Sequence, residues 1–155
     1  NAVKTDVFSW MVGIGALKYE RVFSEKISAQ LGFLFSPNWP TWCSEECSTK
    51  GFAITPEFRY YLSKKPAPRG FYLAPNLRYM KIEEENREEN GVATLTIISP
   101  AVNLGIQFVL INALLIDIWA GPAVNIKSLE ETVPDMGISA GELGIRIGVS
   151  IGVVF

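Results

Sequence analysis

The chain has 155 residues, 48% of them hydrophobic and 19% charged, with 14 basic side chains against 16 acidic ones and no histidine. Its length and the lack of linker-like composition predict one domain, residues 1–155, and its balanced charge argues against a nucleic-acid-binding protein. Without histidine the chain lacks Ser-His-Asp and Cys-His nucleophile systems, His-ligated zinc and the commonest general base, so we expect no enzyme activity, no catalytic residues and no cofactor.

Strand-like segments follow one another along the whole chain. Eight are predicted, in this order: Val3–Trp10, Gly13–Phe23, Lys26–Ser36, Phe52–Leu62, Phe71–Ile82, Ala93–Phe108, Leu114–Lys127 and Gly141–Phe155. Most are long enough to cross a bilayer as tilted strands, which takes about 9–11 residues. Short turns alternate with longer loops between them, which is typical of up-and-down bacterial barrels and places both termini on the short-turn, periplasmic side.

One run without charged residues, Asn90–Ile116, exceeds the roughly 20 residues that a membrane helix needs. Pro100, Asn103 and Gly105 interrupt it, and its Thr, Ile and Val residues favour strands. We therefore predict a hairpin that turns near residues 109–113.

The terminal segment shows the clearest alternation. Every odd position from Leu143 to Phe155 is apolar, and the even positions carry mostly small or polar residues. This period of two is that of a strand with one oily face. The same pattern places apolar residues on the outer face of four other strands: Ile27, Ala29, Leu31, Phe33, Phe35, Phe52, Ile54, Phe58, Tyr60, Leu62, Val102, Leu104, Ile106, Phe108, Ile116, Ile118, Val124 and Ile126.

Alternation alone does not say which face lies inside. Charged and small residues can fill a narrow lumen as paired ions, whereas dense aromatic rows on a wet surface would cause aggregation. We therefore predict an all-β fold, an eight-stranded antiparallel up-and-down transmembrane β-barrel. The alternative is a soluble lipid-binding barrel that holds its apolar face inside.

Aromatic residues near the strand ends fit the two girdles that flank the apolar band of a bacterial barrel. The outer set is Trp10, Trp39, Trp42 and Phe52, and the inner set is Phe23, Phe71, Phe108 and Phe155.

Six charged residues share the inward face near the middle of the strands, and three are acidic and three basic. They are Glu20, Glu57, Arg59, Arg78, Asp117 and Arg146, and Lys18 has the same parity as Glu20. Buried charges need partners because desolvation costs several kcal/mol for each ion, and the planar guanidinium suits pairing with carboxylates. We expect each arginine to reach a carboxylate in an ion-paired plug. The alternative is a conduit or proton path for small polar solutes.

Cys43 and Cys47 lie in the long loop before the fourth predicted strand. In an exported protein, two cysteines in one loop predict a disulfide that stiffens the loop tip. A metal site formed by both thiolates with Glu45 or Glu46 is the weaker alternative, because a second pair of ligands is lacking. We therefore expect no metal.

Four prolines fall within the fourth to seventh predicted strands, one in each, all on the outward face. They are Pro56, Pro75, Pro100 and Pro122. Proline cannot donate to the strand ladder and is normally confined to edges or bulges. These positions indicate either four separate bulges or a patch that faces a partner chain.

Several segments resemble small outer-membrane barrels of the OmpA and OmpX type, and more narrowly a Bacteroidota family of outer-membrane proteins catalogued as a domain of unknown function. The resemblance rests on Ala2–Asp6, Ala16–Glu20, Pro56–Leu62 and the glycine-alternating terminal strand. It implies a location in the bacterial outer membrane, contact with lipid and lipopolysaccharide, and a C-terminal signal, Phe155, that the barrel-insertion machinery reads. It implies no activity.

These patterns together predict a non-enzymatic barrel with a structural or interaction role, either free-standing or as an accessory subunit bound to other outer-membrane proteins. A narrow, porin-like pore or a barrel that binds small solutes is the second expectation.

Overall fold

The computed structural model describes residues 1–36, 47–86, 91–110, 113–131 and 139–155. It contains eight strands and one short helix in this order: β1 (Ala2–Asp6), α1 (Val7–Met11), β2 (Gly15–Val22), β3 (Ile27–Ser36), β4 (Cys47–Tyr61), β5 (Gly70–Asn86), β6 (Gly91–Val109), β7 (Leu114–Glu131) and β8 (Ser139–Val154). No helix in these described ranges is long and apolar enough to span a membrane.

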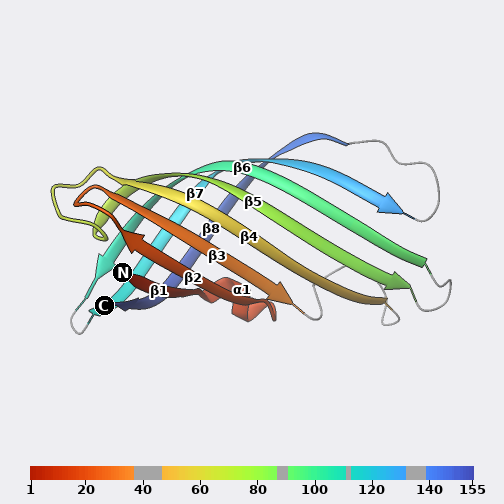
Figure 1. The fold of residues 1–155 in the computed structure, drawn as a ribbon, viewed down its shortest axis with the longest axis horizontal. Coiled ribbons are helices and arrows are strands. Elements are labelled where there is room, and N and C mark those ends of the chain that lie inside the picture. The colour runs from red at the N-terminus through yellow and green to blue at the C-terminus, as the bar shows by residue number, and fades with distance from the viewer. Residues whose placement is uncertain (37–46, 87–90, 111–112, 132–138) are drawn as a thin grey trace.

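The strands form a closed barrel in which each strand pairs with the next along the chain and β1 closes the ring against β8. All eight strand pairings in the described structure are antiparallel, so the topology is up-and-down. The two termini lie side by side at one end of the barrel (Figure 1), where the Asn1 amino group donates to the Phe155 carbonyl at 3.0 Å. The predicted fold class, an eight-stranded antiparallel up-and-down β-barrel, is confirmed.

The strands alternate as predicted between an apolar outer face and a polar inner face. On β4, for example, Phe58 and Tyr60 are exposed while Glu57, Arg59 and Tyr61 are buried. The terminal strand follows the same rule, with Ile145 82% and Ile147 68% exposed.

The first strand is shorter than predicted. The segment Val3–Trp10 does not form one strand, because the chain leaves β1 at Asp6 and enters α1. The Asp6 side chain caps this helix by accepting a hydrogen bond from the Ser9 backbone N–H at 3.2 Å. Trp10 therefore lies on α1, where its indole N–H donates to Thr5 Oγ1.

The strands at the other end of the barrel are longer than predicted. β5 has 17 residues and continues through Glu83–Asn86, and these residues keep their register with Gly91–Thr94 of β6. Backbone pairing does not require apolar side chains. The polar ends of these strands lack the alternation of apolar residues, so the sequence pattern did not predict them as strand.

The seam between β1 and β8 is short. β1 pairs with β8 only over Ala2–Asp6 and Ser150–Val154, so the part of β8 before Ser150 has no strand on its β1 side in the described chain. Figure 1 shows the two strands adjacent near the termini and diverging toward the other end, with α1 near the point where β1 stops.

The four prolines shift no register in the described pairing, although each lacks a ladder pair with the strand on one of its two sides. The one register shift lies between Asn125 and Lys127 of β7, opposite β8. The interpretation of four separate bulges is therefore wrong. Because each proline side chain points outward and is exposed, a regular strand accommodates it where one ladder hydrogen bond is missing.

Candidate functional site

The inner half of the lumen, on the side of the termini, is filled by a square of opposite charges. Lys4 Nζ lies 2.6 Å from Glu20 Oε2 and 3.1 Å from Asp117 Oδ2. Arg59 Nη1 lies 2.9 Å from the same Asp117 oxygen and 3.4 Å from the same Glu20 oxygen. The four side chains come from β1, β2, β4 and β7, so they join different parts of the wall across the interior.

Neutral groups complete the hydrogen bonding of these charges. The Tyr61 hydroxyl donates to Glu20 Oε1 at 2.6 Å, and the Tyr72 hydroxyl donates to Asp117 Oδ1 at 2.6 Å. Gln107 accepts from Arg59 Nη1 at 2.6 Å. We call this set the plug network; its members are Lys4, Glu20, Glu57, Arg59, Tyr61, Tyr72, Gln107 and Asp117.

The plug network is almost completely shielded from solvent. The relative side-chain exposures are 0% for Lys4, Glu20 and Asp117, and 1% for Arg59. Transfer of an unpaired charge out of water costs several kcal/mol of desolvation free energy. Each charge of the plug network has opposite charges and hydrogen bonds around it. The network therefore holds the walls together and leaves no free charge at its centre.

Small residues make room for the bulky side chains. A side chain at Gly105 would meet the ring of Tyr72, and one at Gly148 would meet the indole of Trp119. This pairing of glycine with large aromatic residues lets a narrow barrel fill its interior.

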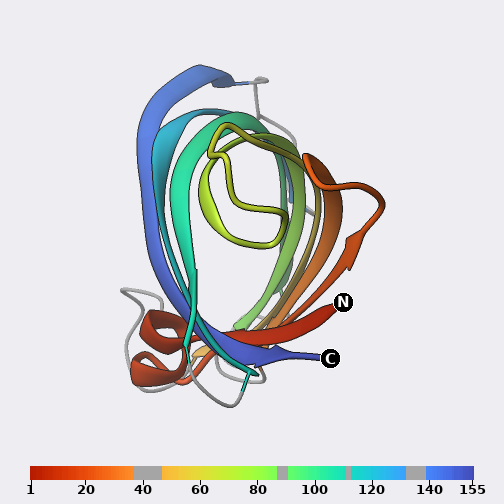
Figure 2. The same cartoon turned by 90° about the vertical axis from the view of Figure 1, so that its left-hand side faces the viewer.

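The turn between β4 and β5 covers the inner end of the barrel. Figure 2 shows this turn, in yellow-green, lying across the mouth of the ring of strands. Pro68 is buried, and Ala67 packs against the cluster of Tyr61 and Tyr72. The Ala67 backbone N–H donates to the Glu25 carbonyl at 2.9 Å, which ties this turn to the turn between β2 and β3.

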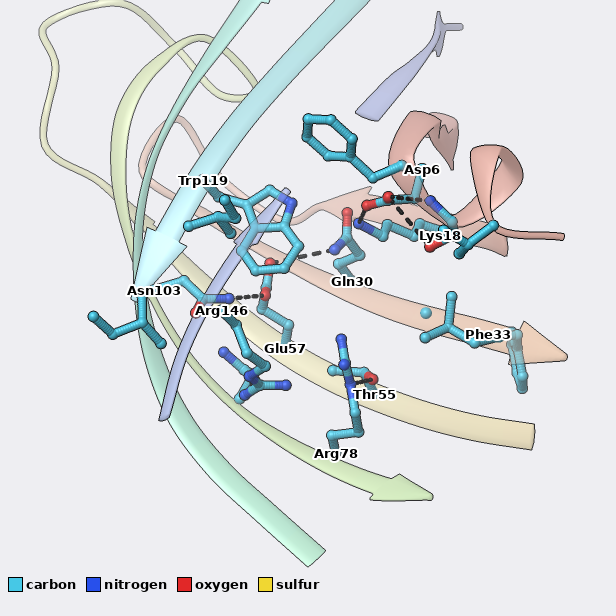
Figure 3. A pocket seen from close by; sticks show the side chains of 18 residues that line it. Asp6, Lys18, Gln30, Phe33, Thr55, Glu57, Arg78, Asn103, Trp119 and Arg146 are labelled. Atoms are coloured by element: carbon cyan, nitrogen blue, oxygen red, sulfur yellow. Dashed lines mark hydrogen bonds and ion pairs between the residues drawn. The ribbon is translucent and has the colours of Figure 1, made fainter. Parts of the chain in front are cut away.

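Glu57 marks the boundary between the plug network and the outer half of the lumen. Its Oε1 accepts from Arg59 Nε at 2.6 Å and from Gln30 Nε2 at 3.3 Å, and its Oε2 accepts from Asn103 Nδ2 at 3.3 Å. Beyond Glu57 the interior opens into a cavity of about 420 Å³ (Figure 3).

The cavity wall carries more positive than negative charge. Its cations are Lys18, Arg78 and Arg146, and its carboxylates are Asp6 and Glu57. Lys18 Nζ pairs with Asp6 Oδ2 at 3.1 Å, and Glu57 is already bound by Arg59.

The two cavity arginines bind neutral groups. Arg78 Nε donates to Thr55 Oγ1 at 3.3 Å, and Arg146 Nη2 donates to Asn76 Oδ1 at 2.7 Å. Figure 3 shows both guanidinium groups among the side chains that line the cavity.

The structure thus brings together only part of the predicted ion-pair set. Glu20, Glu57, Arg59 and Asp117 meet in the plug network. The expectation of a carboxylate within salt-bridge distance is wrong for Arg78 and Arg146. The tilt of the strands carries both into the outer half, away from Glu20 and Asp117, and the Glu57 carboxylate on the cavity wall is bound by Arg59.

The prediction also missed several members of the site. Lys4 completes the charge square from the first predicted strand. Lys4 and Asp6 follow the same alternation as the other inward residues, and Tyr61 stands two residues after Arg59, so counting parity through each strand would have found them.

Four buried polar atoms have no hydrogen-bond partner within the described structure, and all four belong to residues that line this cavity. They are Gln30 Oε1, Asn103 Oδ1, Trp119 Nε1 and Arg146 Nε. Buried polar atoms are seldom left unsatisfied, and each such group requires an explanation. Because all four atoms lie around one cavity, ordered water or a polar ligand in that cavity would satisfy them.

Other predicted site residues lie elsewhere. Cys43 is outside the described residues and Cys47 begins β4, so the disulfide stays a prediction. Within the described ranges no group of three His, Cys, Asp or Glu residues is placed to hold a metal. Trp39 and Trp42 also lie outside the described residues.

The comparison with known protein families identifies the family of this chain. A model of the family described as "Protein of unknown function (DUF3575)" matches residues 1–121, which is more than half of the chain. Neither a curated protein nor a solved structure is significantly similar to the chain.

Proposed function

We propose that this chain, which belongs to the DUF3575 family, is a membrane-embedded barrel of the bacterial outer membrane with a closed lumen and a structural or interaction role, and not an enzyme. The single observation that carries the proposal is the inverted polarity of the barrel. Buried lysine, arginine and carboxylate groups fill the interior, while large apolar side chains are exposed on every strand from β2 to β8.

The exposed apolar surface supports contact with lipid. Water-soluble monomers rarely expose contiguous apolar patches larger than a few hundred Å². Here the exposed apolar side chains of β2 to β8 surround the barrel. The aromatic residues Phe23, Phe71, Phe108 and Phe155 are exposed at the end where the termini lie. A band of apolar residues bordered by aromatic side chains is the outer surface of a bacterial membrane barrel. The alternative, a soluble lipid-binding barrel, would place its apolar face inside.

The filled interior supports a role other than conduction. The plug network closes the inner half, and the turn that carries Ala67 and Pro68 covers the inner mouth. An eight-stranded barrel is just wide enough for its side chains to fill it. The second candidate, a barrel that binds a small solute, is favoured by the cavity of about 420 Å³ in the outer half.

Two measurements on one vesicle preparation test this proposal. The full chain is folded into lipid vesicles, and flotation with the vesicles after a carbonate wash reports insertion. The same vesicles are then fused with a planar bilayer. We expect flotation without stable ion conductance. A protein that stays in the aqueous fraction would contradict the membrane location, and a steady single-channel current would favour the pore.

A partner within the membrane would bind at the prolines of β4 to β7. Glu57 pairs with Asn76 and Ala101 pairs with Ala123, so the prolines that precede these residues are diagonal neighbours: Pro56 with Pro75, and Pro100 with Pro122. Leu77 pairs with Pro100, which joins the two proline pairs into one patch.

Lipid, lipopolysaccharide and the barrel-insertion machinery are the other expected partners of the chain. Crosslinks from a native complex that map only to β1–β3 and β8 would exclude the proline patch of β4 to β7 as the partner-binding surface.

A further inference from the structure

We propose that the cavity in the outer half of the barrel binds an amphiphile, with its anionic head group, a phosphate or a carboxylate, on Arg78 and Arg146 and its alkyl chain in the side opening between β8 and the α1 region. The alkyl part of this proposal rests on the membrane location proposed above.

The cavity reaches through the wall of the barrel. Its lining includes inward residues such as Arg78 and Asn103, and also outward apolar residues of β3 and β8, among them Phe33, Ile145 and Ile147. Ile145 and Ile147 lie on the part of β8 that precedes Ser150, where no strand pairs with β8 on its β1 side in the described structure. The short β1–β8 seam leaves this opening in the wall, since β1 ends at Asp6.

The opening is apolar on both sides. Ile145 and Ile147 line the cavity on the β8 side of the seam, and Phe8 and Val12 of the α1 region line it as well. Ile145 and Ile147 are 82% and 68% exposed, because no strand covers this edge of β8 in the described structure. An alkyl chain there would contact apolar side chains along one side and lipid along the other.

The inner part of the cavity suits an anionic head. Arg78 and Arg146 bind only neutral side chains there, and the Nε of Arg146 and the indole N–H of Trp119 have no acceptor within the described residues. Guanidinium groups bind phosphate and carboxylate through charge-assisted hydrogen bonds. The amide oxygens Gln30 Oε1 and Asn103 Oδ1, which have no donor in the described structure, would accept hydrogen bonds from hydroxyl groups of the head group.

The size of the cavity is consistent with this ligand. Pockets for small molecules are typically about 300–1,000 Å³ and combine apolar walls with a few convergent polar groups. The cavity here, of about 420 Å³, has both, and two of its polar side chains, Gln30 and Asn103, donate to Glu57.

Native mass spectrometry of the full chain in an uncharged maltoside detergent tests the site. The probes are palmitoyl-lysophosphatidic acid, palmitate, monopalmitoylglycerol and inorganic phosphate. The first and third share tail and glycerol and differ in the phosphate, so their comparison does not depend on any variant. We expect one bound lysophosphatidic acid or palmitate, and binding of monopalmitoylglycerol that is at least about tenfold weaker. The stronger of the two anionic probes identifies the head group as phosphate or carboxylate.

Variants locate the head group. R78Q and R146Q should each weaken binding of the anionic amphiphile at least about fivefold, whereas R69Q, which removes an exposed arginine from the β4–β5 turn, should leave it unchanged. Equal binding of monopalmitoylglycerol, binding of inorganic phosphate as tight as that of the amphiphile, or unchanged binding in R78Q and R146Q would each overturn the proposal. Because these measurements are made in micelles, their failure leaves the vesicle flotation result untouched.

Discussion

Arg59 is the residue whose removal should disturb the barrel most. It lies within 3.4 Å of carboxylate oxygens of Glu20, Glu57 and Asp117. In the variant Arg59→Met, Lys4 alone would face two carboxylates and Glu57 would lose its cation. Methionine retains most of the aliphatic volume, so the effect is chiefly electrostatic.

The magnitude follows from burial. Removing one partner of a buried ion pair costs about 3–5 kcal/mol, because the remaining charge is left uncompensated. The Arg59 side chain is only 1% exposed and serves three such partners, so we expect a loss in the free energy of unfolding in this range. Arg21→Met is the matched control, since Arg21 is exposed on the outer face of β2, and it should change stability by less than about 0.5 kcal/mol.

The assay is urea unfolding of the barrel in lipid vesicles, followed by tryptophan fluorescence and by the gel mobility of unheated samples. Adding Asp117→Asn to Arg59→Met restores the balance of charge around Lys4 and should recover about 0.5–3 kcal/mol. If Arg59→Met unfolds at the same urea concentration as Arg21→Met, the plug network does not stabilise the barrel and our reasoning fails.

Two further predictions follow from the same geometry, and a third follows from the sequence. Leu104→Arg, on the exposed outer face of β6, should lower the unfolding free energy in bilayers by about 2–4 kcal/mol; wild-type stability would show that this face does not meet lipid. Gly148→Val should cost about 1–3 kcal/mol by overpacking against Trp119, and Trp119→Ala in the same chain should relieve part of that cost in the urea assay. Cys43 and Cys47 should be joined by a disulfide in the exported protein, and two free thiols in non-reducing mass spectrometry of fresh outer membrane would disprove it.

The alternation of side chains predicted the barrel well because a strand has a strict period of two. The β6–β7 hairpin was found inside the charge-free run, since Pro100, Asn103 and Gly105 contradict a helix. The faces of β4 and β8 were assigned correctly for the same reason. Each of these inferences depends only on neighbouring residues.

The helix α1 could not be predicted in this way. It has five residues, which is too short for a helical period, and its start depends on the Asp6 cap. The early end of β1 opens the seam beside β8, so the cavity too was hidden from the sequence.

The partners of the inward charges were predictable only in part. Parity gives the face of the sheet on which a residue lies, but strand tilt and stagger determine its height in the lumen. Arg59 and Arg78 both lie on the inward face of their strands, yet one reaches Asp117 and the other reaches Thr55. Charge pairing across a barrel therefore needs the three-dimensional register.

The central claim, that the apolar outer face meets lipid and the polar face is enclosed, is tested most directly by spin labels along β6. Single cysteines are introduced at Val102, Asn103, Leu104, Ile106, Gln107 and Phe108 in a Cys43→Ser, Cys47→Ser background, labelled with a nitroxide and reconstituted in vesicles. Oxygen, which concentrates in lipid, should reach the labels at even positions, while those at the odd positions Asn103 and Gln107 should be shielded from oxygen and from a water-soluble nickel complex. Labels at 102, 104, 106 and 108 that are accessible to nickel and poorly accessible to oxygen would contradict the account.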